Sequence, residues 1–530
     1  MPPVPSIFTG EPSFPKIDLG QAAQFRTEHD DPSSPQTPPG LGLLARNGRL
    51  MSQDLGAKVR TSILALQGRQ AVIMAVNIVV GVILARKLGP AVFGLYGIAT
   101  FCLSLITMAT DFGIGGSLVQ RKGVFGEHEV SVVFTLQTGI ALAAATLVWI
   151  LAPLSLSIYR QAPHELVWII RSLSLSILLS PVGTTARLQL EREIQFHKIA
   201  TIDISGMVVS NAVILGMVYS GMGVWSFVAG NIANALATTF GAWLVIRYRP
   251  RFVIDWKLVR ELLSFGIFFQ FGNITNEAAG WIIPLIAGAS LGPAAVGLLT
   301  WASSNARRPL MVVDNVMRVA FPHFSRLQEH PEELGRQVGL YFRRLLLLCF
   351  AWTFLSILLG APMTHLVYTD KWMPGLLALQ LFAFGLALDV VNWVGGMTLN
   401  AVGGVKDTAK WTLTKSVLAI CGAFLGLHLW GINGIPLASI VASLISGTGI
   451  LFHLRKRIPI HFPDLWMPSI PFLLAGLAYL PFWFLGGGAR LAGGWCIGVG
   501  MIGWTAWKGY KEFSGGRIAV KTEQGGDLVG

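Results

Sequence analysis

The chain has 530 residues, of which 53% are hydrophobic and only 13% are charged, and its mean hydropathy is +0.60. A soluble globular domain carries about 25% charged residues, so this composition excludes an ordinary soluble enzyme and predicts an integral membrane protein. The net charge of +13 does not indicate nucleic-acid binding, because Lys and Arg accumulate in the cytoplasmic loops of membrane proteins. No basic patch with interleaved aromatic residues occurs outside those loops.

Residues 1–58 are rich in Pro, Ser, Gly and Gln and contain no apolar run. This composition predicts a disordered cytoplasmic tail and not a signal peptide, which needs an apolar core. A more typical start follows at Met51. Two interpretations of residues 1–50 therefore stay open: a mis-called start, or a dispensable extension of the native protein.

From Thr61 onward, apolar runs of membrane-spanning length alternate with short polar connections, since a spanning helix needs about 20 apolar residues. We expect an all-α polytopic membrane protein with about 14 transmembrane helices. The domains would be a six-helix bundle over 59–250, a second over 251–457, two extra helices over 458–510 and a cytoplasmic tail over 511–530. The predicted spans are 61–86, 93–120, 130–154, 166–186, 199–219, 223–247, 261–287, 293–320, 341–362, 375–402, 410–430, 432–454, 466–485 and 490–508.

One stretch of the sequence occurs twice. Leu88–Leu95 recurs as Leu291–Leu298, 203 residues later, with six of eight positions identical. Each copy lies between the first two spans of its half, where Gly and Pro end one helix and begin the next. Internal repeats of this length indicate two related halves, and membrane proteins built in this way are often transporters.

Loop charge predicts the orientation of the chain. An even number of spans puts both termini on one side, where the loops contain 20 Lys and Arg residues, against 5 in the loops of the other side. Positive charge accumulates in the cytoplasm, so both termini are predicted to be cytoplasmic. Both copies of the repeat then lie on the periplasmic side, which predicts parallel repeats related by an axis along the membrane normal.

The span 261–287 carries a polar stripe. Asn273, Asn276 and Glu277 lie at helical spacing on one face. A carboxylate inside the membrane needs a cavity or a cationic partner, so this face is a candidate surface of a central cavity. Hydrogen bonding between helices uses the same residue types and is the alternative.

Two adjacent arginines, Arg307 and Arg308, fall near the middle of the span 293–320. Neither can lose its charge, and a charged group at the bilayer centre costs about 2.5–3.5 kcal/mol. They therefore need water, an acid or an anionic ligand, and a guanidinium fork suits phosphate. Two alternatives stay open: an ion pair with Glu277 or Asp314, and a helix break at Pro309 that exposes the pair.

Other polar residues extend these stripes. Asp389 and Asn392 share one face of the span 375–402, and Arg69 lies close enough to the cytoplasmic start of its span to snorkel. Asp111 precedes a glycine-rich turn, where pairing with a nearby cation at the helix end is the alternative. The candidate substrate-cavity residues are Arg69, Asn273, Asn276, Glu277, Arg307, Arg308 and Asn392, and the candidate ion-coupling residues are Asp111, Glu277 and Asp389.

Several chemical motifs are missing from the sequence. It contains no phosphate-binding GxxxxGK[ST] loop, no nucleophile elbow, no HExxH and no Cys or His set at metal-ligand spacing. The loops are too short to form an active site, and no acid and base are paired at usable spacing. We therefore expect a transporter and no enzyme, with no catalytic residue, cofactor or metal. The 247–261 connection, with Phe252 and Trp256 among charges, predicts an amphipathic helix in contact with membrane lipids.

Several motifs in chain order resemble a known family: Leu84–Tyr96, Asp111–Ile114 followed by Gln120–Lys122, Ser264–Gly266, and Phe321–Arg326. They are similar to those of the Wzx-type flippases of lipid-linked oligosaccharides, the polysaccharide transporters of the multidrug/oligosaccharidyl-lipid/polysaccharide exporter superfamily. The resemblance implies two six-helix bundles around a V-shaped central cavity, plus two C-terminal helices. It implies alternating access that moves an undecaprenyl-diphosphate-linked repeat unit across the bacterial inner membrane for exopolysaccharide, capsule or O-antigen synthesis. A cationic cavity in such flippases receives the diphosphate and acidic sugars, and an ion gradient or the membrane potential drives many of them.

Two other functions remain as alternatives. A multidrug and toxin extrusion antiporter of the same superfamily would favour an acidic cavity, against which Arg307 and Arg308 argue. A membrane polysaccharide polymerase would need a large periplasmic loop, and the predicted periplasmic loops are short. The sugar, the coupling ion, the oligomeric state and any association with a polymerase or glycosyltransferases stay open.

Overall fold

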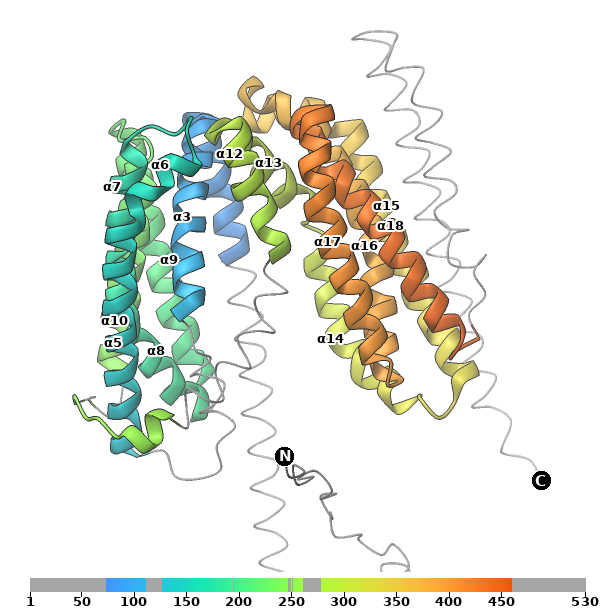
Figure 1. Cartoon of the computed structure of the whole chain (residues 1–530), viewed down its shortest axis with the longest axis horizontal. Helices are drawn as coiled ribbons and strands as arrows, with labels where there is room; N and C mark the ends of the chain where they lie inside the picture. The colour runs from blue at the N-terminus through green and yellow to red at the C-terminus, as the bar shows by residue number, and fades with distance from the viewer. Residues whose placement is uncertain are drawn as a thin grey trace, which may run out of the picture. The chain divides into compact units, whose positions relative to one another are not determined.

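The computed structural model describes residues 73–110, 126–193, 195–245, 249, 251–260 and 278–459, all within the compact unit Ala65–Gly530. Every secondary-structure element in these ranges is a helix, which confirms the all-α prediction (Figure 1). The two tails and the last two predicted spans lie outside the described residues, so the expected total of about 14 helices stays a prediction.

The described helices of the first half follow the predicted spans closely. The helix 73–87 leads into α3, and Gly126 precedes α5. Two short helices then lead to the pair α7 and α8, which together fill the predicted span 166–186. The bounds are α3 Pro90–Thr110, α5 Glu127–Leu151, η1 Ala152–Leu154, α6 Ser155–Ile158, α7 Glu165–Leu173, α8 Leu175–Arg192, α9 Phe196–Tyr219 and α10 Trp225–Val245.

The second half repeats this order of long helices with more interruptions. Gly431, at φ +56°, allows the tight turn between two of them, and both lie in one continuous apolar stretch, Val405–Arg455. The bounds are η2 Ala278–Trp281, η3 Ile283–Ala287, α12 Gly288–Leu291, α13 Pro293–Ala306, α14 Leu310–Arg326, α15 Pro331–Met363, η4 Thr364–Tyr368, η5 Asp370–Gly375, α16 Leu376–Ala401, α17 Val405–Trp430, η6 Gly431–Asn433 and α18 Gly434–Arg455.

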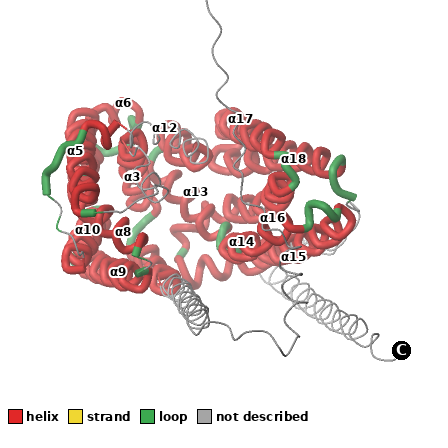
Figure 2. The backbone as a smooth tube through the Cα atoms, turned by 90° about the horizontal axis from the view of Figure 1, so that it is seen from below, coloured by secondary structure: helices red, strands yellow, loops and turns green. Residues whose placement is uncertain are grey.

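Eight stretches of the described residues are long and apolar enough to cross a membrane. The packing is the same in both halves: α10 packs on α9 and α8, and α5 on α8, while α18 packs on α17 and α16, and α15 on α16. Figures 1 and 2 show the helices of each set running side by side. The fold is therefore two related helical bundles, as the repeated sequence predicts.

The two copies of the repeat contact each other where α3 crosses α13. A Cβ atom on Gly94 would overlap the carbonyl oxygen of Pro293, and a Cβ on Gly297 would overlap the carbonyl oxygen of Pro90. Only glycine allows two helix backbones to approach this closely. The contact is reciprocal, so the repeated glycines join equivalent surfaces of the two halves.

Trp372 of η5 packs beside this crossing. Its side chain is fully buried, and its Nε1 donates a hydrogen bond of 2.9 Å to the carbonyl oxygen of Ala85. Its ring centroid lies 5.2 Å from that of Phe93 and 5.5 Å from that of Trp301. A buried indole N–H needs such a partner, and here the partner belongs to the other half of the chain.

The structure differs from the predictions in two segments. Helices α14 and α15 continue through most of the connection expected between the spans 293–320 and 341–362, because the polar residues there still favour helix outside an apolar span. Residues 251–255 are not helical, so the predicted amphipathic helix is wrong for them. Val253 instead donates its N–H to Thr135 Oγ1 of α5 at 2.9 Å. A helix begins at Trp256, where Asp255 Oδ1 accepts hydrogen bonds from the backbone N–H groups of Lys257 and Leu258.

Candidate substrate and ion sites

The span 293–320 is broken at the two arginines. Helix α13 ends at Ala306, residues 307–309 form a turn, and α14 begins at Leu310. Pro309 has no N–H to donate to the preceding turn, and its ring disfavours continuation of the helix. The helix break considered as an alternative is therefore confirmed, and Arg307 is exposed while Arg308 is half-buried.

A small polar network holds the Arg308 guanidinium. Its Nε and Nη2 donate to Asn305 Oδ1 at 3.2 and 2.8 Å, and Nη2 also donates to Tyr368 Oη at 3.2 Å. Tyr368 Oη donates to the same Asn305 oxygen at 2.9 Å. These neutral partners fix the orientation of Arg308 without compensating its charge.

The nearest acid along α14 is Asp314. It is half-buried, and the charges of Arg307 and Arg318 both act on it. No carboxylate among the described residues lies within 4.0 Å of Arg307 or Arg308. The described part of the break thus carries more positive than negative charge, as an anion-binding site requires.

Asp389 forms an ion pair inside the second bundle. Its Oδ1 lies 2.6 Å from Lys415 Nζ of α17 and accepts a hydrogen bond of 2.6 Å from Ser443 Oγ of α18. About a third of each charged side chain is exposed, 31% for Asp389 and 29% for Lys415. The pair therefore ties three helices together near their midpoints.

Asn392, one turn after Asp389, faces α18. Its Nδ2 donates to the carbonyl oxygen of Ser443 at 3.0 Å, and its Oδ1 is buried without a hydrogen-bond partner. This is a contact between helices, so a role of Asn392 in substrate binding stays a prediction. The candidates Arg69, Asp111, Asn273, Asn276 and Glu277 lie outside the described residues.

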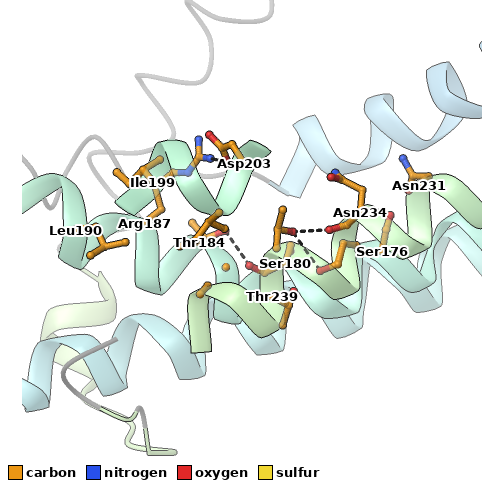
Figure 3. Close-up of a pocket in the computed structure, with 15 residues that line it drawn as sticks. Ser176, Ser180, Thr184, Arg187, Leu190, Ile199, Asp203, Asn231, Asn234 and Thr239 are labelled. Carbon is orange, nitrogen blue, oxygen red and sulfur yellow. Dashed lines mark hydrogen bonds and ion pairs between the residues drawn. The ribbon is translucent and has the colours of Figure 1, made fainter. Parts of the chain in front are cut away.

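The first bundle contains a cavity of about 490 Å³ between α8, α9 and α10 (Figure 3). Hydroxyl and amide side chains line it, and an ion pair of 2.6 Å between Arg187 and Asp203 bridges α8 and α9 at its border. Its polar lining residues include Ser176, Ser180, Thr184, Asn231, Asn234, Thr238 and Thr239.

This cavity and Lys415 were not predicted. Ser176, Ser180 and Thr184 recur every four residues and so share one face of α8, and Asn231 and Asn234 are three apart on α10. This spacing could have predicted a polar face on each of the two helices. Lys415 could have been noticed as a lone cation inside the apolar span 410–430, because such residues usually have a partner or face a cavity.

Two related helical bundles, a helix break at an arginine pair, and polar groups buried at membrane depth define a multi-pass membrane protein of the transporter type. The comparison with known families agrees. A family model described as "Polysaccharide biosynthesis protein" matches residues 83–377, more than half of the chain. The chain belongs to this polysaccharide biosynthesis protein family.

Two curated relatives illustrate the family. The chain is 25% identical over 429 residues to the lipopolysaccharide biosynthesis protein WzxC of Escherichia coli (strain K12), which covers 77% of this chain and 84% of that protein. It is 29% identical over 312 residues to the succinoglycan biosynthesis transport protein ExoT of Rhizobium meliloti (strain 1021), covering 56% of this chain and 61% of that protein.

Two solved structures share the fold. The lipid II flippase MurJ in an inward closed conformation has a TM-score of 0.63 at 14% identity, covering 81% of this chain and 96% of that chain. An inward-facing multidrug resistance transporter of the MATE family has a TM-score of 0.58 at 14% identity, covering 75% and 98%. At this identity the likeness establishes the fold alone.

Proposed function

We propose that this protein is a flippase that moves an undecaprenyl-diphosphate-linked oligosaccharide repeat unit across the bacterial inner membrane. The unit would pass from the cytoplasmic to the periplasmic leaflet for assembly into exopolysaccharide, capsule or O-antigen. Membership of a polysaccharide biosynthesis family and two relatives named for lipopolysaccharide biosynthesis and succinoglycan transport support this function. Both termini would lie in the cytoplasm, as the loop charges predict.

The helix break at Arg307 and Arg308 is the observation that carries the proposal. A diphosphate presents planar sets of anionic oxygens that a guanidinium fork can bind in a bidentate manner. Arg308 is held in place by Asn305 and Tyr368, and Arg307 is exposed. One arginine is therefore pre-oriented and the other free to reach the ligand, which lowers the entropy cost of binding.

Movement of the two bundles, 59–250 and 251–457, would expose this site to each side of the membrane in turn. The helices 458–510 would lie outside the moving core. Asp389, with Lys415, is the described candidate for coupling to an ion, together with Asp111 and Glu277. The substrate arrives from glycosyltransferases and leaves to a polymerase, so either enzyme class is a natural partner.

A multidrug and toxin extrusion antiporter is the second candidate, because one MATE transporter shares the fold. A cationic drug would be repelled by the excess positive charge in the described part of the helix break. A polysaccharide polymerase is the weakest candidate, since the relatives include a protein named as a transport protein.

Deletion of the gene followed by lipid analysis tests the proposal. We expect surface polysaccharide to disappear while lipid-linked repeat units remain in the cytoplasmic leaflet. Units that still reach the periplasm, with only the polymer length altered, would support a polymerase instead.

The double variant Arg307→Ala/Arg308→Ala tests the helix break. We expect at least a tenfold loss of polymer export at normal protein abundance, because charge-assisted hydrogen bonds are each worth about 1.5–3 kcal/mol. Arg160→Ala, at an exposed arginine in a turn distant along the chain, is the control and should export normally. Unchanged export in the double variant would remove both arginines from the mechanism.

A further inference from the structure

The cavity in the first bundle presents hydrogen-bond acceptors. Five of its hydroxyl groups, those of Ser176, Ser180, Thr184, Thr238 and Thr239, donate to backbone carbonyl oxygens at 2.7–3.1 Å. A hydroxyl group has one proton to donate and two lone pairs that accept. With the protons used, the lone pairs of these oxygen atoms remain available to a ligand; Figure 3 draws the lining side chains and their hydrogen bonds.

A proline inside α8 explains part of this arrangement. Pro181 lies inside the helix and cannot donate to the carbonyl oxygen of Ile177. Ser180 Oγ donates to that oxygen at 2.8 Å. From α10, Thr239 Oγ1 reaches the carbonyl oxygen of Leu179 at 3.1 Å. The hydroxyl protons thus have a structural task, and they are not free for a ligand.

Asn231 and Asn234 add side-chain amides to the lining. Oδ1 of Asn231 is buried and has no hydrogen-bond partner, so it is not one of the acceptors that face the cavity. The carboxylate of Asp203, also in the lining, is held by Arg187 at 2.6 Å. The described lining is therefore rich in acceptors and carries no uncompensated charge.

A fitting ligand must donate several hydrogen bonds, be neutral and fill a sizeable space. A volume of about 490 Å³ lies within the range of about 300–1,000 Å³ found for organic ligands. It is too large for a bare cation, and no group of three or more Asp, Glu, His or Cys residues suited to a metal occurs in the described residues. A sugar ring with free hydroxyl groups meets all three requirements.

We propose that this cavity, between α8, α9 and α10, binds a neutral sugar residue of the transported oligosaccharide. The inference rests on the proposed flippase function and assigns the sugar end of the substrate to the first bundle. The lining on α8 runs from Ser176 to Leu190, about 21 Å along the helix at 1.5 Å per residue. It reaches the end of α8 that loop charge predicts to be cytoplasmic, the side from which the substrate enters.

The test measures binding of methyl glycosides to the full-length protein in lipid nanodiscs by saturation-transfer NMR. The probes are the methyl glycosides of glucose, galactose, N-acetylglucosamine and glucuronic acid. We expect saturable binding of at least one neutral glycoside. Thr184→Val should weaken it about fivefold, and Thr184→Val/Thr238→Val about thirtyfold, since each removes an acceptor hydroxyl from the site.

Thr146→Val is the matched control. Thr146 also donates to the carbonyl oxygen four residues earlier, at 2.8 Å, but it lies exposed on α5 outside the cavity. It should bind glycosides as the wild type does. Equal binding by the cavity variants and this control would overturn the proposal, as would the absence of saturable binding of every neutral glycoside.

A measurement with sodium tests whether the cavity is a cation site instead. Thermal stabilisation by sodium relative to choline, lost in the cavity variant and unaccompanied by glycoside binding, would overturn the proposal in favour of a cation site. The experiments can refute the flippase function and the sugar site independently of each other. Unchanged polymer export after gene deletion, with variant-sensitive glycoside binding, would refute the flippase and retain the sugar site. Lost export with variant-insensitive binding would do the reverse.

Discussion

Substitution of Gly297 by alanine tests whether the crossing of α3 and α13 holds the two halves together. The new Cβ would overlap the carbonyl oxygen of Pro90 and lie 3.1 Å from the nitrogen of Gly94. Both neighbours are backbone atoms, which cannot swing aside as a long side chain could. Overpacking of this kind costs about 1–3 kcal/mol, so the closed crossing should lose about 5–150-fold in population.

Disulfide formation between Gly97→Cys and Val296→Cys reports the closed crossing. A Cβ on Gly97 would lie 3.6 Å from Cγ1 of Val296, an ordinary contact distance. In a background without the four native cysteines, the initial rate of cross-linking follows the closed population. We expect Gly297→Ala to slow it at least fivefold.

Gly81→Ala is the control for this experiment. No atom lies within 4 Å of a Cβ at Gly81, and alanine favours helix over glycine by about 1 kcal/mol. It should leave the cross-linking rate unchanged and raise thermal stability slightly. The close approach of the repeated glycines would be refuted if Gly297→Ala cross-linked as fast as Gly81→Ala.

The Asp389–Lys415 pair and the 251–260 segment give two further predictions. Lys415→Met leaves the Asp389 carboxylate without its cation, so the free energy of unfolding should fall by about 1–3 kcal/mol, between the values for exposed and buried pairs. Lys415→Met/Asp389→Asn should regain part of it in thermal unfolding, whereas purely additive losses would contradict the coupling. At the surface, the Leu258 amide and the His128 imidazole lower the pKa of Asp255. Its stabilising contribution is therefore complete above about pH 4 and is lost as the pH falls through the lowered pKa. The protection of backbone amides from hydrogen exchange at the start of the helix 256–260 should decrease in acid, and Asp255→Asn should remove that pH dependence.

Apolar run length predicted the helices well, because a membrane imposes one length on every span. The ends of α9 and α16 fall within a few residues of the predicted limits 199–219 and 375–402. The break at Arg307 was visible only as an alternative, since Pro309 in a membrane helix can either kink the helix or end it.

Side-chain partners were harder to predict, because they depend on how each helix is rotated about its axis. A stripe such as Ser176, Ser180 and Thr184 satisfies its protons on carbonyl oxygens three or four residues earlier in the chain. The same local pattern occurs at Thr146, which lies outside the cavity. Sequence spacing identifies the stripe, but only the packing of α8 against α9 and α10 shows that it lines a cavity.

The two bundles use equivalent helices in different ways. In the second bundle, the junction of α16, α17 and α18 contains Asp389, Lys415 and Ser443, joined by contacts of 2.6 Å. In the first bundle, the equivalent junction of α8, α9 and α10 holds its ion pair, Arg187–Asp203, at the border and leaves a cavity. The helices that pack together are equivalent in the two bundles, and the side chains that fill the two junctions differ. One junction has its ion pair at the centre, and the other keeps its ion pair at the border of a cavity, where we propose that a sugar binds, so the two repeats have diverged at equivalent positions.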